Sequence, residues 1–242
     1  MYNFVNKVVT GLNKCIGIIG GMGPLATCDL MKKIITSMNV KTDQEYVRIC
    51  VDCNTNIPDR TTAILHEGKT PLHEMVKSAV RLQGDGADVL TIACNTAHHY
   101  YDEIKQYVDI PILHMPQETA NALKRENIQN AAILATDGTV QCGIYDRALN
   151  EAGIRPVYPN AQEQQLIMKL IYQCVKAGES YSVYIKDINA MVERLKNAGA
   201  QALVLGCTEL PIVFDELQLD IPCVDPTEIL ARAAIQFCRY GS

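Results

Sequence analysis

The sequence contains an internal repeat that predicts two similar halves. The stretch GADVLTIACNT (86–96) aligns without a gap with GAQALVLGCTE (199–209), and this alignment puts Cys94 and Cys207 at equivalent positions. Two further pairs of similar segments flank the first pair: CIGIIGGMGPLAT (15–27) with NAAILATDGTVQ (130–141), and IPILHMPQE (110–118) with IPCVDPTE (221–228). Because all three pairs occur in the same order, we expect a duplicated fold.

Short apolar runs alternate with longer segments of helical period along both halves. The runs predict strands at residues 15–20, 46–53, 88–93, 110–114, 131–135, 155–158, 202–206 and 221–224. Helices are predicted between them, among others at 24–38, 71–84, 139–153 and 183–199. Continuous apolar strands that alternate with amphipathic helices are typical of parallel sheets covered on both faces. The predicted fold class is therefore α/β.

The repeat also predicts how the chain divides into domains. We expect two similar α/β domains with parallel sheets, related by a pseudo-twofold axis, with the active site in the cleft between them. The first domain is predicted over residues 1–114, completed by a C-terminal helix at 226–242. The second domain is predicted over residues 115–225.

Charge and composition argue against several classes of protein. The chain has 242 residues and a formal net charge of −5, without the basic footprint that nucleic acids or anionic membranes attract. No apolar run approaches the roughly 20 residues that a membrane span needs. The first residues, MYNFVNKVVTGLNK, do not resemble a signal peptide. Ten cysteines spread over this length indicate thiols in a reducing compartment, which predicts a cytoplasmic protein.

Cys94 and Cys207 each follow a predicted strand at its carboxyl end. Ligands bind at this edge of an open α/β sheet, so two facing halves would bring both thiols to one cleft. Two opposed thiols suit the inversion of a stereocentre, because one thiolate removes the Cα proton from one face while the other thiol protonates the opposite face. A free cysteine has a pKa of about 8.5, which allows both forms close to neutral pH.

Small polar residues follow each cysteine. Asn95-Thr96 follows the first cysteine and Thr208-Glu209 follows the second, where the next helix is predicted to begin. Asn and Thr favour helix caps, and the first turn of a helix favours a thiolate and offers backbone donors to a carboxylate. Donors at this place would also stabilise the negative charge that moves into the substrate carboxylate as the Cα proton leaves.

Five motifs carry a resemblance to a known family: GIIGGMGP (17–24), NIPDRT (56–61), ACNTAH (93–98), KAG (176–178) and LGCTEL (205–210). With them, nearly the whole chain beyond the first dozen residues resembles the aspartate/glutamate racemases, which are cofactor-independent amino-acid racemases with two cysteines. The glutamate branch carries an Asp-Ser pair in the first glycine loop and a histidine after the second Cys-Thr. This chain has Gly21-Met22-Gly23 and Glu209 at those places, which indicates the aspartate branch.

The resemblance implies an isomerase that interconverts L- and D-aspartate, with glutamate as a further candidate substrate. It implies Cys94 and Cys207 as the two catalytic acid/bases. The residues expected around the substrate are Met22, Arg60, Asn95, Thr96, Lys176, Thr208 and Glu209, with Arg60 and Lys176 near the carboxylates. It implies no pyridoxal phosphate and no metal. The expected partners are a small acidic amino acid and a second copy of the chain, not nucleic acid or a membrane.

Two other readings of the same residues stay open from the sequence. Cys94 and His98 have the spacing of a metal pair on a helix, which His99, Cys207 and Glu209 could complete as a zinc site. A hydrogen-bonded structural role for His98 is the favoured alternative. The segment 21–26 satisfies the G-x-G-x-x-A fingerprint of a nicotinamide dehydrogenase, with Asp52 ending the next strand. That reading leaves the duplicated cysteines unexplained.

The other cysteines are interpreted as packing residues, because free cysteine is often buried. This interpretation covers Cys15, Cys28, Cys142, Cys174, Cys223 and Cys238. Packing or chance is also favoured over a redox or zinc pair for the C-x-x-C of Cys50 and Cys53. A surface charge is the alternative for Lys176, whereas Arg60 follows a strand in a loop suited to holding a ligand.

Two alternatives to racemisation come from other functional classes. One is a non-catalytic, acidic amino-acid-binding or regulatory protein on the same scaffold. The other is an isomerase or decarboxylase that uses one base. Both thiols are present in this chain, and this favours racemisation.

Overall fold

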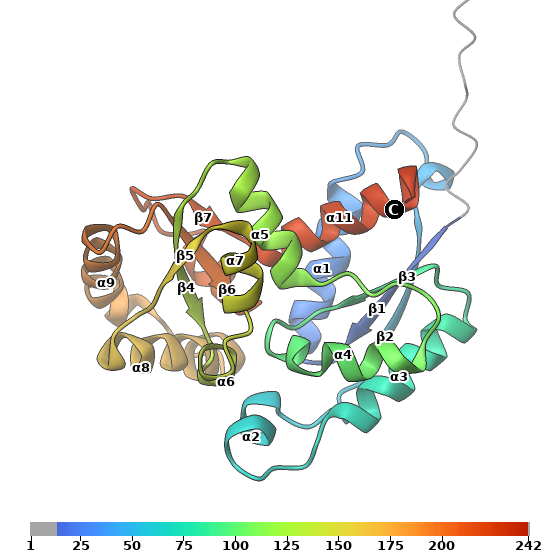
Figure 1. Ribbon diagram of the computed structural model, residues 1–242, viewed down its shortest axis with the longest axis horizontal. Helices are drawn as coiled ribbons and strands as arrows, with labels where there is room; N and C mark the ends of the chain where they lie inside the picture. Colours follow the sequence, from blue (N-terminus) through green and yellow to red (C-terminus); the bar gives the residue numbers. More distant parts are fainter. Residues whose placement is uncertain (1–13, 242) are drawn as a thin grey trace, which may run out of the picture.

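Two separate parallel sheets form the frame of the protein. The computed structural model describes residues 14–241, so residues 1–13, including most of the segment compared with a signal peptide, and Ser242 lie outside it. One sheet has the strand order β2-β1-β3 and the other the order β5-β4-β6-β7, and every strand pair is parallel. Figure 1 shows the sheets in two regions of the molecule. The predicted α/β class with two parallel sheets is confirmed.

The first region contains three strands and four α-helices before α5 (Met115–Arg125). They are β1 (Cys15–Gly20), α1 (Pro24–Thr36), β2 (Arg48–Cys53), α2 (Arg60–Leu65), α3 (Leu72–Gly84), β3 (Val89–Ile92) and α4 (Tyr101–Ile104). The strand predicted at 110–114 is reduced to a single bridge between Leu90 and Ile112. Pro111 has no N–H to donate, and α5 begins at Met115, so the pairing cannot extend.

The second region repeats this arrangement with four strands. Its elements are β4 (Asn130–Ala135), α6 (Asp137–Gln141), α7 (Asp146–Ala152), β5 (Arg155–Val157), α8 (Ala161–Lys169), a π-helix (Leu170–Lys176), α9 (Ile185–Asn197), β6 (Ala202–Gly206), α10 (Leu210–Phe214) and β7 (Cys223–Val224). If the Ile112 bridge is counted as a fourth strand, both regions have the same strand order. The prediction of one helix at 139–153 is wrong, because Gly143 has a φ of +59° and separates α6 from α7.

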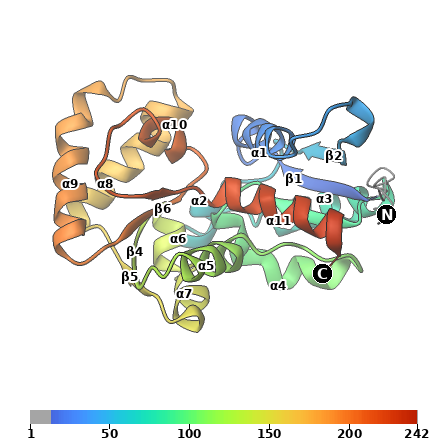
Figure 2. The same cartoon turned by 90° about the horizontal axis from the view of Figure 1, so that it is seen from above.

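Helices cover both faces of each sheet. The first sheet lies between α1 with α11 (Pro226–Tyr240) on one face and α3 with α4 on the other. The second lies between α8, the π-helix, α9 and α10 on one face and α5 (Met115–Arg125) with α7 on the other. Figure 2 shows α11 leaving the second region and running along the first. No helix within residues 14–241 combines the length and the apolar composition needed to cross a membrane.

The carboxyl ends of the central strands turn sharply into the segments that hold the candidate residues. At the end of β1, Gly21 has a φ of +89°, and a Cβ there would lie 2.3 Å from the backbone of Asn54. Only glycine fits this close approach, which lets the chain turn at Met22. At the carboxyl ends of β3 and β6, the chain reaches the two cysteines: Cys94 lies two residues beyond β3, and Cys207 directly follows β6.

Candidate active site

All the candidate residues meet around one small cavity between the two regions. The cavity measures about 10 Å³, which is room for about one water molecule. Its lining includes Met22, Arg60, Cys94, Asn95, Thr96, Lys176, Cys207, Thr208 and Glu209, joined by Asp59, Thr61, Thr136 and Tyr172. Cys94 is 6% exposed and Cys207 is 7% exposed. The repeat therefore brings its two cysteines together in the fold.

Cys207 lies beside a carboxylate. Its thiol donates a hydrogen bond to Oε2 of Glu209 at 3.0 Å, and the Thr208 hydroxyl donates to the same oxygen at 3.0 Å. Burial and the neighbouring Glu209 raise the pKa of Cys207 well above its usual value. The side of the cavity formed by β6 therefore holds a protonated thiol near neutral pH.

Cys94 shares its side of the cavity with a buried arginine. Arg60 begins α2 and is 7% exposed, and its two terminal nitrogens donate to the carbonyls of Met22 and Pro58, both at 3.0 Å. Burial by itself would lower the pKa of Arg60, but the interactions with Cys94 and Asp59 raise it. Nε of Arg60 has no hydrogen-bond partner within residues 14–241. This guanidinium is thus held in place while its Nε–H stays available to a ligand.

A family model described as Asp/Glu/hydantoin racemase matches residues 19–234. The chain belongs to this family. A broad-specificity amino-acid racemase from Bacillus subtilis is 28% identical over 235 residues, which cover 91% of this chain and 96% of that protein. A solved structure of an aspartate racemase from Picrophilus torridus has 33% identity and a TM-score of 0.82, covering 93% of this chain and 94% of that one.

A third relative shows the same fold at lower identity. It is an aspartate racemase homologue from Pyrococcus horikoshii, with 24% identity, a TM-score of 0.78 and coverage of 93% of this chain and 99% of that one. The resemblance seen in the sequence is confirmed by the family match, and so is the predicted enzyme class, a racemase. The family acts on small amino-acid substrates.

The residues after the racemase's two cysteines do not form the predicted side-chain caps. A 3₁₀-helix begins at Thr96 and α10 begins at Leu210, but neither preceding side chain makes a capping hydrogen bond. Asn95 instead accepts a hydrogen bond from Tyr145. The Thr96 hydroxyl is bonded to two threonine hydroxyls of the second region, those of Thr136 and Thr139, at 3.0 and 2.9 Å.

His98 is a buried structural residue in this racemase. One ring nitrogen, Nδ1, contacts the carbonyl of Cys94 at 3.0 Å, and Nε2 accepts a hydrogen bond from the backbone of Met115 at 3.1 Å. Burial lowers the pKa of His98 to about 3. Since both nitrogens are engaged, His98 is not free to bind zinc. In the described part of the chain, no three histidine, cysteine or acidic side chains are grouped as for a metal ion.

One wall of the cavity joins the two regions through charged and aromatic side chains. Nζ of Lys176 lies 3.9 Å from Oε1 of Glu209 and 4.4 Å from the ring centre of Tyr172. The Tyr172 hydroxyl donates to Oδ2 of Asp59 at 3.3 Å. Burial would raise the pKa of Asp59, but hydrogen bonds from Thr62 and the charges of Arg60 and Lys176 lower it. The wall therefore contains two cations and two carboxylates.

Sequence reasoning missed two residues of this wall, Asp59 and Tyr172. Asp59 had a signal, because it directly precedes Arg60 in the NIPDRT motif. Tyr172 precedes Lys176 by four residues, a helical spacing that would have placed both on one face. The π-helix that carries them has no comparable mark in the sequence.

A second cavity of about 390 Å³ lies outside this wall. It shares six residues with the small cavity: Met22, Asp59, Arg60, Lys176, Thr208 and Glu209. The exposed side chains of Leu25 and Ile212, one from each region, line its outer part. Movement of the shared wall would join the two cavities into one route from solvent to the thiols.

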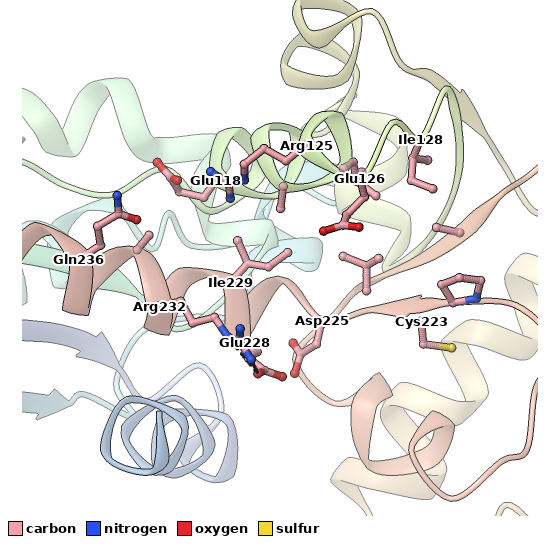
Figure 3. A pocket seen from close by; sticks show the side chains of 16 residues that line it. Glu118, Arg125, Glu126, Ile128, Cys223, Asp225, Glu228, Ile229, Arg232 and Gln236 are labelled. Atoms are coloured by element: carbon pink, nitrogen blue, oxygen red, sulfur yellow. Dashed lines mark hydrogen bonds and ion pairs between the residues drawn. The ribbon is translucent and has the colours of Figure 1, made fainter. Parts of the chain in front are cut away.

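A larger cavity, of about 580 Å³, does not fit the family's chemistry. It lies between α5, α11 and the β7 segment and contains none of the candidate residues (Figure 3). Its charged side chains are four carboxylates and two arginines: Glu118, Glu126, Asp225, Glu228, Arg125 and Arg232. This excess of negative charge disfavours an acidic substrate, and its one cysteine, Cys223, has a pKa that burial raises to about 11.

The interpretation of the other cysteines as packing residues is half correct. Cys15, Cys174 and Cys238 are buried, but Cys28, Cys142 and Cys223 are exposed. The prediction rested on the average burial of cysteine in proteins. The three exposed cysteines instead lie on the outer face of α1, in the turn after α6 and in the short strand β7.

The C-x-x-C residues do not form a pair. Cys50 Sγ lies 3.4 Å from Cys15 Sγ, whereas Cys53 is exposed. The dehydrogenase reading also lacks support, since Asp52 is bound to Arg81 at 2.9 Å.

Proposed function

We propose that this racemase interconverts L- and D-aspartate by a two-base mechanism, with Cys94 and Cys207 as the acid/bases. The observation that supports this most strongly is that both buried thiols line one cavity. In one direction the Cys94 thiolate takes the Cα proton and the Cys207 thiol gives its proton to the opposite face. The reverse direction exchanges these tasks, so no cofactor or redox partner is needed.

The surroundings of Cys207 support its part as the proton donor in this direction. On the other side of the cavity, Arg60 brings a positive charge close to Cys94. Glu209 accepts the hydrogen of the Cys207 thiol, and burial and its charge raise the pKa of Cys207. Glu209 would therefore act through Cys207, in addition to any contact with the substrate.

The charges around the cavity suit an acidic amino acid. Arg60 and Lys176 offer one cation for each of two carboxylates, and Asp59 and Glu209 offer acceptors for the substrate ammonium group. Nε of Arg60 and Nδ2 of Asn95 are buried donors without a partner in the described part of the chain. A carboxylate would satisfy both, and such charge-assisted hydrogen bonds are strong. We assign Met22, Thr96 and Thr208 to the remaining substrate surface.

Similarity to characterised relatives supports aspartate as the substrate. The Picrophilus torridus relative, at 33% identity, is an aspartate racemase. The Bacillus subtilis relative is a broad-specificity racemase, so glutamate and other amino acids belong in the same assay.

We also propose that the protein is a cytoplasmic homodimer. Each chain would have two domains, one formed by residues 1–114 with 226–242 and the other by residues 115–225. Light scattering of the purified chain tests the dimer.

The experiment that tests the function follows optical rotation. Purified protein is incubated separately with L-aspartate and L-glutamate, without added cofactor, and we expect L-aspartate to lose its rotation. Cys94→Ala and Cys207→Ala should each abolish racemisation and remain folded, whereas Cys142→Ala, which removes an exposed thiol, should stay active. Substantial racemisation by either of the first two variants would refute the two-base mechanism. Aspartate binding without any loss of rotation would favour the binding-protein alternative.

Isotope exchange and chelation extend this test. Product formed in deuterium oxide should carry deuterium at Cα, because the proton that is delivered comes from a thiol that exchanges with solvent. Activity should survive treatment with EDTA and should not increase with pyridoxal phosphate or NAD. Loss on chelation that zinc restores would redirect attention to Cys94 and its neighbours as metal ligands.

A further inference from the structure

Tyr145 connects the two strand ends that carry the cysteines. It precedes α7 in the second region and is 1% exposed. Its hydroxyl donates a hydrogen bond to Oδ1 of Asn95, the residue after Cys94 in the first region. Its ring lies against Gly206, the residue before Cys207, since a Cβ on Gly206 would lie 3.3 Å from Cε2 of Tyr145. One buried side chain therefore contacts the sequence neighbours of both cysteines.

The hydrogen bond from Tyr145 determines which end of the Asn95 amide faces the cavity. Asn95 is 2% exposed and lines the cavity. The phenol occupies the carbonyl end of the amide, so the NH₂ end is left for a ligand. Nδ2 has no hydrogen-bond partner in the described part of the chain. A buried donor without a partner is unfavourable, and a carboxylate in the cavity would satisfy it.

Packing alone does not explain a tyrosine at this position. The ring belongs to the apolar core between the second sheet and helices α5 and α7, where phenylalanine would fill nearly the same space. The hydroxyl is the one feature that phenylalanine lacks, and it donates a hydrogen bond to Asn95. Burial raises the pKa of Tyr145, so the hydroxyl stays protonated and keeps its ability to donate.

We infer that Tyr145 is a positioning residue for racemisation: its hydroxyl holds the Asn95 amide so that Nδ2 donates to a carboxylate of the substrate. The inference rests on the proposed function and adds to it a residue from the opposite region that no motif indicated. Tyr145 itself does not line the cavity, so it acts through Asn95.

The test replaces the hydroxyl and keeps the ring. Tyr145→Phe should lower kcat/KM for aspartate about tenfold, because the freed amide can turn its carbonyl toward the substrate and one hydrogen bond to a charged group is lost. The matched control is Tyr181→Phe, which removes the hydroxyl of another tyrosine of the second region, bonded to Glu216 outside the cavity. The control should keep the wild-type kcat/KM.

A double-mutant cycle separates positioning from a general structural effect. Asn95→Ala should lower kcat/KM, and the addition of Tyr145→Phe to it should lower kcat/KM no further, because the amide that Tyr145 holds is gone. Independent, multiplying losses would overturn the inference. The dissociation constant of succinate, a dicarboxylate that cannot react, gives a readout without turnover. It should rise about tenfold in Tyr145→Phe and stay unchanged in Tyr181→Phe.

A second variant keeps the test decisive if Tyr145→Phe does not fold. Asn95→Asp keeps an acceptor for the phenol and removes the donor, so it should lose affinity for succinate; retained affinity would overturn the inference. A wild-type protein that racemises neither amino acid would refute the proposed function. An active wild type beside a fully active Tyr145→Phe would refute only the role of Tyr145.

Discussion

Arg60 gives the clearest prediction about substrate choice. It is buried, two of its nitrogens are fixed by backbone carbonyls, and Nε is unpaired among the described residues. Arg60→Ala should lower kcat/KM for aspartate by roughly ten- to a thousandfold, since hydrogen bonds to charged groups contribute roughly 1.5–3 kcal/mol and more where a charge is left unpaired. Arg60→Lys should recover only part of this, because lysine lacks the planar fork.

Steady-state kinetics with aspartate and alanine measure this effect. Alanine has no second carboxylate, so its kcat/KM should fall much less than that of aspartate. The control is Arg81→Ala, which removes an exposed arginine bound to Asp52 outside the cavity. Equal losses of kcat/KM for both amino acids would instead show that Arg60 binds the α-carboxylate that they share, or that it acts on Cys94.

Glu209 should set the pH range in which Cys207 remains a thiol. After burial, its charge is the main reason for the raised pKa of Cys207, and a neutral neighbour removes that part. Glu209→Gln should therefore lower the pKa of Cys207 and move the alkaline limb of kcat/KM to lower pH. The thiolate absorbance near 240 nm, titrated with Cys207→Ala as the blank, measures the pKa directly. An unchanged pKa would contradict the role given to Glu209.

Individual site residues were predictable where a motif or the repeat marked them. Cys94 and Cys207 stood at equivalent positions, and they do line one cavity. The partners of the polar side chains were not predictable, because they come from the other half of the chain: Tyr145 for Asn95, and Thr136 with Thr139 for Thr96. Pairings over such distances leave no local pattern in a single sequence.

Among the elements, the turn after Cys94 and helix α5 are tied together by His98, and this predicts a pH dependence of stability. Burial lowers the pKa of His98 to about 3 in the folded state, against an ordinary value of about 6.5, and it also lowers that of His114. The folded protein therefore binds fewer protons than the unfolded chain below about pH 6.5. Its stability should be full above this pH and fall as the pH drops toward 3.

Urea unfolding between pH 7 and pH 4 measures this dependence. Each such histidine contributes at most about 1.4 kcal/mol per pH unit to the slope of the free energy of unfolding. His98→Gln should be less stable at pH 7 and should show a shallower slope, because glutamine does not titrate. Equal slopes for the variant and the wild type would show that His98 does not contribute to the pH dependence of stability.

Strands β1 and β6 were predictable as elements because each is a continuous apolar run. Both agree with the predicted bounds, and the other strands differ by one or two residues at an end, except that the strand predicted at 110–114 is only a bridge. The helix predicted at 139–153 failed because its apolar spacing continues through a turn that Gly143 imposes. The π-helix over Leu170–Lys176 shares its apolar pattern with an ordinary helix, so its geometry could not be read from the sequence.

At the scale of the whole molecule, the small cavity shows that this structure is closed. A space of about 10 Å³ holds one water molecule and no amino acid, so substrate must enter by movement of the two regions or of the wall between the cavities. Iodoacetamide should therefore label the exposed thiols of Cys28 and Cys53 faster than Cys94 and Cys207. Added aspartate should slow the labelling of the last two further.

Peptide mapping by mass spectrometry gives the rate for each cysteine. Cys174, which is buried in the core of the second region, is the internal reference for a thiol that only unfolding exposes. Labelling of Cys94 and Cys207 faster than this reference would report opening of the cleft. Labelling as fast as that of the exposed cysteines would contradict a closed resting state.

The two thiols have different neighbours, but thermodynamics limits how far this difference can affect the kinetic constants of the two enantiomers. Mirror-image amino acids have the same free energy in water, so the equilibrium constant is one and kcat/KM must be equal in both directions at every pH. Arg60 beside Cys94 and Glu209 beside Cys207 can therefore make kcat and KM differ between the two enantiomers, but only by the same factor for both constants. Initial rates from the L- and D-enantiomers should show two different pairs of constants with one common ratio. A fold built from two similar halves would thus give the two enantiomers different kcat and KM, although the equilibrium constant of the reaction is one.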